Sequence, residues 1–138
     1  MIQRIQSVYL LLVIIACVVY IFVPVGQIKT PENVTEIWLI KNDIPIMIGA
    51  IVVAMFAFAA IFLFNNRITQ MKVVLIDIVL SVVLIGLFLF GLFKYMGIQN
   101  YTFGVGAILP IFILLFNILA YSSIKADENL VKSMDRLR

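Results

Sequence analysis

The sequence contains no histidine and a single cysteine, and only 12% of its 138 residues are charged. The lack of histidine excludes His-containing zinc sites, haem held by two histidines, and catalytic triads or proton shuttles that need an imidazole. Because Cys17, which lies inside an apolar run, is the only cysteine, an internal disulfide and a CxxC redox pair are excluded as well. No nucleophile stands beside a base and no set of metal ligands is present, so we expect no enzymatic activity, no cofactor and no metal.

Apolar residues are in excess, at 64% of the chain against roughly 45–50% in an average soluble protein. A domain of this size has too little interior to bury so many apolar side chains, because small domains keep much of their surface in water. The composition therefore predicts that a large apolar surface faces the lipid bilayer. The net charge of +3 includes no basic run with interleaved aromatic residues, so we expect no nucleic-acid partner.

Four apolar runs each have the length that a helix needs to cross a hydrocarbon core of roughly 30 Å. They are residues 7–23, 44–64, 73–93 and 103–121. Backbone groups in lipid must be paired within their own segment, which favours helices. The first run ends at Val23-Pro24 rather than at a small-x-small cleavage site, so we expect it to be retained. The sequence thus predicts an all-α, multi-pass integral membrane four-helix bundle in one domain, residues 1–138.

The distribution of lysine and arginine predicts the orientation of this bundle. With both termini on one side, that side holds seven of the ten basic residues: Arg4, Arg67, Lys72, Lys125, Lys132, Arg136 and Arg138. The other side holds the remaining three: Lys29, Lys41 and Lys94. Because basic residues accumulate on the cytoplasmic side, we expect both termini in the cytoplasm.

The segments outside the four runs carry weaker signals. Thr30-Pro31-Glu32 is typical of a helix start, and Trp38 follows it, so residues 30–41 fit a short helix on the outer membrane interface; an irregular loop is an equally good interpretation. The tail, residues 122–138, has apolar residues at helical spacing and predicts a short amphipathic helix on the cytoplasmic face. Pro110, inside the fourth run, is expected to bend that helix.

Asp77 is the only charged residue within the limits of the four runs. We expect it about one turn, or roughly 6 Å, inside the cytoplasmic end of its helix. Asn117 lies about one turn before the cytoplasmic end of the fourth helix, at a level similar to that of Asp77, and Ser81 lies one turn deeper than Asp77 on the same face. One hypothesis is a polar cluster of Asp77, Ser81 and Asn117 that binds a proton, an ion or a lipid headgroup. The alternative is that these side chains only hold helices together, worth roughly 0.6–2 kcal/mol.

The second apolar run, residues 44–64, also contains a pattern that favours close helix packing. Ala50, Ala54 and Ala57 are small residues on one stripe, and such stripes let helix backbones approach closely in lipid.

Both ends of the chain carry a family resemblance. The opening Met1-Ile2-Gln3-Arg4-Ile5-Gln6-Ser7-Val8-Tyr9-Leu10, the segment Gly106-Ala107-Ile108-Leu109-Pro110 and the tail from Asp127 to Arg138 resemble a small inner-membrane family typical of the Bacteroidota. That family is domain of unknown function 4293. The resemblance implies a four-helix integral protein of a bacterial inner membrane, and it implies no activity, cofactor or catalytic residue.

Two functions from different classes agree with these observations. The first is a small polytopic scaffold or accessory subunit without catalytic activity, which packs against other membrane helices in a homo-oligomer or a larger complex. The second is a small transporter or an ion- or lipid-handling protein that uses the cluster around Asp77. Four short helices enclose little interior, so a transport pathway would need several copies of the chain.

Overall fold

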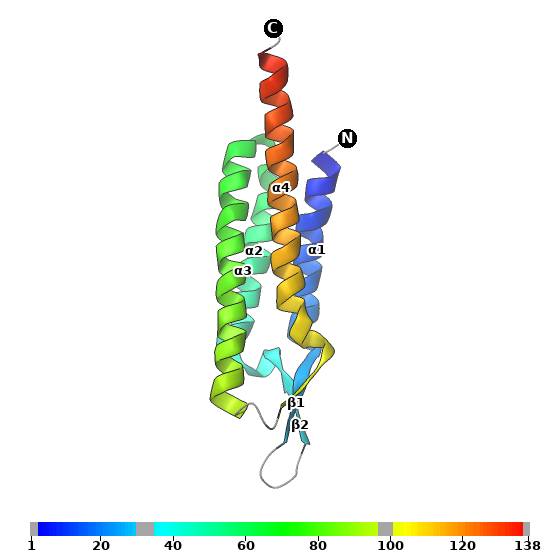
Figure 1. Cartoon of the computed structure of the whole chain (residues 1–138), viewed down its shortest axis with the longest axis vertical. Coiled ribbons are helices and arrows are strands. Elements are labelled where there is room, and N and C mark those ends of the chain that lie inside the picture. The colour runs from blue at the N-terminus through cyan, green and yellow to red at the C-terminus, as the bar shows by residue number, and fades with distance from the viewer. Residues whose placement is uncertain (1–2, 30–34, 97–100, 137–138) are drawn as a thin grey trace.

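Four long helices dominate the computed structural model, which describes residues 3–29, 35–96 and 101–136 (Figure 1). They are α1 (Gln3–Phe22), α2 (Ile44–Phe62), α3 (Arg67–Met96) and α4 (Leu109–Asp135). Each of them is long and apolar enough to cross a membrane.

The helices form a ring in chain order. α1 packs against α2 and α4, and α3 packs against the same two helices. We call the end of the bundle where α1 begins and α4 ends the terminal end, and the opposite end the sheet end (Figure 1). Neighbouring helices run antiparallel, and α4 extends beyond the other three at the terminal end.

The outer faces of the helices are apolar, whereas their inner faces carry small and polar residues. Val8, Met55, Val79 and Ile111, one on each helix, expose 53–64% of their surface. Water-soluble monomers rarely expose large apolar patches, so these faces are built for lipid or for other helices. The alanine stripe of α2 turns inward as expected: Ala50 and Ala57 are fully buried, and Ala54 is half-buried.

Two helices are longer than the apolar runs that predicted them. α3 begins at Arg67 rather than at residue 73, because residues 67–72 are polar but contain no helix breaker. Asn66 accepts a hydrogen bond from the Thr69 backbone amide (3.4 Å), which helps to start the helix. Gln70 donates to the backbone oxygen of Ala60 on α2 (3.0 Å) and holds this start in place.

The C-terminal tail forms no separate helix. α4 continues through residue 121 to Asp135, because this stretch contains no glycine or proline that would end it. Gln6 of α1 donates a short hydrogen bond to the Asp127 carboxylate and so ties the continuation to the bundle. Glu128 and Lys132 form an ion pair across one turn, with 3.4 Å between Oε1 and Nζ.

Pro110 does not bend α4, which corrects the expectation from the sequence. α4 begins at Leu109, so Pro110 lies in its first turn, where no backbone donor is needed. The residues before it form a 3₁₀ turn, η4 (Val105–Ile108), and not the first turns of a membrane helix.

A three-stranded antiparallel sheet lies at the sheet end, and the all-α prediction missed it. Its strands are β1 (Pro24–Lys29), β2 (Thr35–Leu39) and β3 (Tyr101–Phe103), in the order β2-β1-β3. Residues 35–39 are therefore a strand and residues 40–42 a 3₁₀ turn, η1, rather than an interfacial helix; residues 30–34 lie outside the described part of the chain. The central strand, β1, pairs with β2 on one side and with β3 on the other.

Aromatic side chains join the sheet to the bundle. Trp38 of β2 is only 7% exposed, so it does not lie on the surface as expected. Its ring stacks on Phe88 of α3 (centroids 5.8 Å apart) and meets the edge of Tyr101 of β3 (6.1 Å). We call Trp38, Phe88 and Tyr101 the aromatic cap. The Tyr101 hydroxyl donates to the backbone oxygen of Val25 (2.7 Å), and burial raises its pKa to about 12, so the donor keeps its proton at neutral pH.

We predict that Gly104→Ala destabilises the protein, whereas Gly86→Ala does not. A Cβ on Gly104 would lie 2.7 Å from the backbone oxygen of Pro24, whereas a Cβ on Gly86 would have no atom within 4 Å. The first change should cost about 1–3 kcal/mol through overpacking. The second should be neutral or stabilise α3 by up to about 1 kcal/mol. Thermal unfolding in detergent measures both, and equal midpoints for the two variants would contradict the close packing of η4 on β1.

A buried polar cluster as the candidate functional site

Asp77, Ser81 and Asn117 meet in the interior of the bundle, and the side chain of each has no exposed surface. α3 places Asp77 and Ser81 one turn apart on its inner face, and α4 supplies Asn117. The Ser81 hydroxyl donates to the backbone oxygen of Asp77 (2.8 Å), and the Asn117 amide donates to the Ser81 hydroxyl oxygen (2.9 Å). The structure thus brings together the three residues that the sequence singled out. We call them the core polar cluster.

Asp77 lies further from the start of its helix than the sequence indicated. Asp77 comes ten residues after Arg67, where α3 begins, which places it about 15 Å along the helix axis at 1.5 Å per residue. The shorter distance expected from the sequence assumed that the helix starts at residue 73. Among the described residues no basic side chain forms an ion pair with Asp77, so its partners are the neutral groups around it.

Three oxygen atoms in the cluster accept no hydrogen bond from the described residues. They are both carboxyl oxygens of Asp77 and the side-chain oxygen of Asn117. Buried polar atoms are nearly always paired, so three acceptors without a donor need an explanation. A protonated carboxyl group supplies one O–H donor, and the Asn117 side chain lies close enough to Asp77 to interact with it. These acceptors can therefore hold a proton or bind another small hydrogen-bond donor.

Two other buried side chains lie on α1, and only Cys17 is near the cluster. Cys17 has no exposed surface and lies within electrostatic range of Asp77, in keeping with its apolar surroundings in the sequence. Tyr20 is also fully buried, and its hydroxyl has no hydrogen-bond partner among the described residues. The sequence analysis did not predict the buried position of Tyr20, because a tyrosine near the end of an apolar run also suits a membrane interface.

The sequence analysis missed the buried polar contacts nearer the terminal end. Gln6 bonds to Asp127 between α1 and α4, and Gln70 bonds to Ala60 between α3 and α2. Gln6, Gln70 and Asp127 are each at most 5% exposed. Their positions just outside the predicted apolar runs made them look like surface residues. Within the described ranges, no group of three or more Cys, Asp or Glu side chains is placed to hold a metal ion.

We predict that Asp77→Asn preserves the stability of the bundle and that Asn117→Ala lowers it. The new amide at position 77 has nearly the shape of the carboxyl group and supplies the missing donor for Asn117. Removing Asn117 breaks its bond to Ser81, at a cost of roughly 0.6–2 kcal/mol. Unfolding midpoints in detergent test both changes. A large loss with Asp77→Asn would show that the charged carboxylate itself holds the fold together.

Comparison with known proteins identifies a family but no activity. The family model described as Domain of unknown function (DUF4293) matches residues 2–137, nearly the whole chain. No curated protein matches the chain, and no solved structure does. The match covers all four helices and the three strands between them. The chain therefore belongs to the DUF4293 family, as the resemblance at its two ends predicted.

Proposed function

We propose that this protein is a small, non-catalytic scaffold or accessory subunit of a bacterial inner membrane. The observation that carries the proposal is the apolar outer face of all four helices around a closely packed ring. In lipid, helices associate through close packing of such faces, because lipid chains are as apolar as the side chains. The interior supports the same role, since the Asn117 amide bonds across from α4 to Ser81 of α3, and Ser81 bonds to the α3 backbone.

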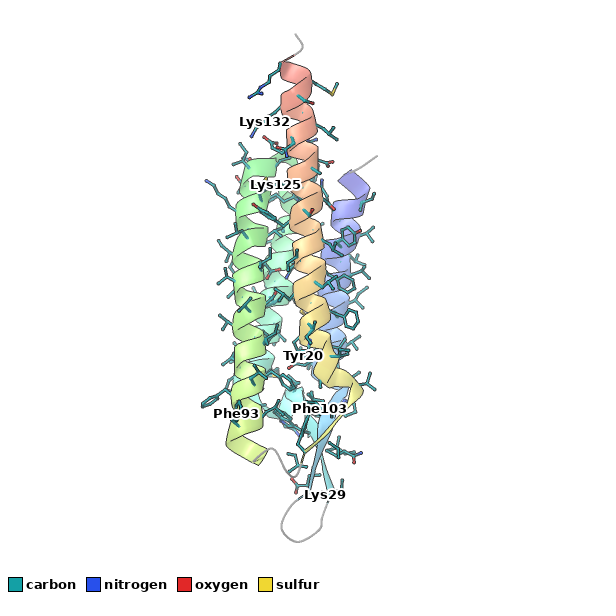
Figure 2. The ribbon with its side chains drawn as sticks, viewed as in Figure 1. Tyr20, Lys29, Phe93, Phe103, Lys125 and Lys132 are labelled. Carbon is teal, nitrogen blue, oxygen red and sulfur yellow. The ribbon has the colours of Figure 1, made fainter. Side chains whose placement is uncertain are left out.

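The charges at the two ends support an orientation with both termini in the cytoplasm. At the terminal end, Arg67, Lys72, Lys125 and Lys132 belong to α3 and α4. Figure 2 shows Lys125 and Lys132 on α4 at this end and Lys29 beyond the bundle at the other. Lysine and arginine accumulate on the cytoplasmic side of membrane proteins, which supports a terminal end in the cytoplasm and a sheet on the outside.

Cysteine labelling tests this orientation. We predict that Lys41→Cys reacts with a membrane-impermeant maleimide in intact cells, whereas Lys125→Cys reacts only after the cells are made permeable. Both lysines are exposed and lie at opposite ends of the bundle, so they form a matched pair. Each is introduced with Cys17→Ser, although Cys17 is itself fully buried. The reverse labelling pattern would overturn the orientation.

The scaffold role predicts a stoichiometric complex in mild detergent that depends on one outer face. Tryptophan replaces one exposed residue on each helix in turn: Val8→Trp, Met55→Trp, Val79→Trp and Ile111→Trp. A specific helix partner should dissociate with one or two of these variants and survive in the others, because only the contacting face is disturbed. Native mass spectrometry of the purified complex measures the outcome. A lone monomer from the unmodified protein would contradict the role.

The unpaired oxygens of the core polar cluster favour a second candidate, a small transporter or ion- or lipid-handling protein. An ionisable residue deep in a span is expensive, and such residues often mark transport paths. This role requires a homo-oligomer with a polar path along Asp77. Loss of a cellular phenotype in Asp77→Asn at unchanged protein level would favour it over the scaffold. Loss of phenotype and level together would favour a purely structural Asp77.

A further inference from the structure

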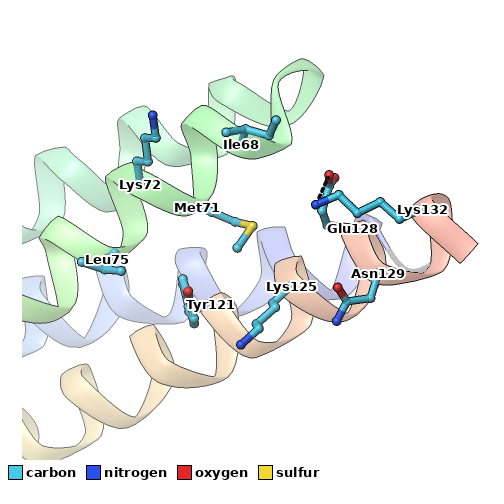
Figure 3. Close-up of a pocket in the computed structure, with 9 residues that line it drawn as sticks. All are labelled: Ile68, Met71, Lys72, Leu75, Tyr121, Lys125, Glu128, Asn129 and Lys132. Carbon is cyan, nitrogen blue, oxygen red and sulfur yellow. Dashed lines mark ion pairs between the residues drawn. The ribbon is translucent and has the colours of Figure 1, made fainter.

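A groove of about 380 Å³ opens between α3 and α4 at the terminal end of the bundle, away from the core polar cluster (Figure 3). Its floor is apolar or amphipathic, with Met71, Leu75 and Tyr121 between the two helices. Three lysines line it: Lys72, Lys125 and Lys132. Figure 3 shows Lys72 and Lys125 on opposite sides of the groove, with Met71 and Tyr121 between them.

The two lysines across the groove lie at the same depth. The bond between Asn117 and Ser81 fixes the level of α4 against α3. From there, Lys72 lies nine residues and Lys125 eight residues towards the terminal end, about 12–14 Å along each helix. The two ammonium groups therefore start from one level of the bundle, next to the amphipathic ring of Tyr121, which suits the headgroup region of a membrane.

The charge of the groove is only partly balanced. Glu128 pairs with Lys132, with 3.4 Å between the charged atoms. In the part of the chain that the structure describes, neither Lys72 nor Lys125 has an ion-pair partner. Asn129 adds an amide that can donate a hydrogen bond at the outer edge. Two unpaired cations and an amide above an apolar floor complement an anionic headgroup attached to an acyl chain.

We propose that this groove binds an anionic phospholipid: Lys72 and Lys125, whose ammonium groups point away from each other in Figure 3, turn inward to its phosphate, and an acyl chain runs past Met71 towards Leu75. Basic pockets between helices on the cytoplasmic side are where anionic headgroups bind membrane proteins. Leu75 is 49% exposed and lies one turn deeper than Lys72, so an acyl chain along it would cover apolar surface. The site rests on the proposed membrane placement, but it needs neither a protein partner nor the core polar cluster.

Native mass spectrometry of the full-length protein in detergent tests the site, with phosphatidylglycerol and phosphatidylcholine of identical acyl chains as probes. The unmodified protein should retain phosphatidylglycerol more strongly. Each basic residue near an anionic lipid is worth roughly fivefold in affinity, so Lys72→Gln with Lys125→Gln should reduce this preference tenfold or more. The matched control, Lys29→Gln with Lys41→Gln, removes the same charge from exposed positions at the sheet end and should keep the preference.

A variant that retains more phosphatidylglycerol provides a second test, because a misfolded protein would lose the lipid rather than retain more of it. Glu128→Gln removes the negative charge beside Lys132 and should raise the preference for phosphatidylglycerol. Excess glycerol 3-phosphate should not displace the lipid, because it lacks the acyl chain that the floor contacts. Equal retention of the two lipids, or equal losses in the two double-lysine variants, would overturn the site. Displacement by glycerol 3-phosphate would also overturn it as a lipid site. None of these outcomes bears on whether a protein partner exists.

Discussion

The outer faces of all four helices are apolar, and every other feature of the structure has to agree with that constraint. In the proposed membrane placement, a polar group that points outward from these helices would meet lipid rather than water, which agrees with the inward position of their buried polar side chains. The core polar cluster, Gln6 and Gln70 follow this rule, and Ser81, Asn117, Gln6 and Gln70 each donate to a neighbouring side-chain or backbone oxygen. Small side chains on α2 then let the ring close around them.

The same constraint explains why the sheet lies at the end of the bundle. Strands have unpaired edges that lipid cannot satisfy, whereas the region beyond the helices can hold them. β1 pairs with β2 and β3 and connects segments that are about 75 residues apart in the chain. The aromatic cap fastens this sheet to α3 through Trp38 and Phe88. The packing of Gly104 against Pro24 brings the start of α4 close to β1.

The sequence predicted what depends on local composition and failed where distant segments meet. The four helices follow from apolar runs of sufficient length, and the closeness of Asp77, Ser81 and Asn117 follows from counting residues along antiparallel helices, although Asn117 bonds to Ser81 rather than standing level with Asp77. The strand Pro24–Lys29 contains proline and glycine and shows no alternation, so only its partners reveal it. Trp38 suited the membrane surface equally well, and Phe88, fifty residues away, determines that it is buried. The predicted start of α3 was wrong because residues 67–72, which are largely polar, continue the helix without an apolar signal.

The central claim, that the outward helix faces lie in lipid, is open to a direct measurement. A nitroxide attached at Val79→Cys, on the exposed middle of α3, reports its own depth in a reconstituted bilayer by electron paramagnetic resonance. The account predicts strong relaxation of this label by oxygen, which concentrates in hydrocarbon, and weak relaxation by a water-soluble nickel chelate. A label at Lys41→Cys should show the opposite pattern. Equal access of the nickel chelate to both labels would place the face of α3 in water and contradict the account.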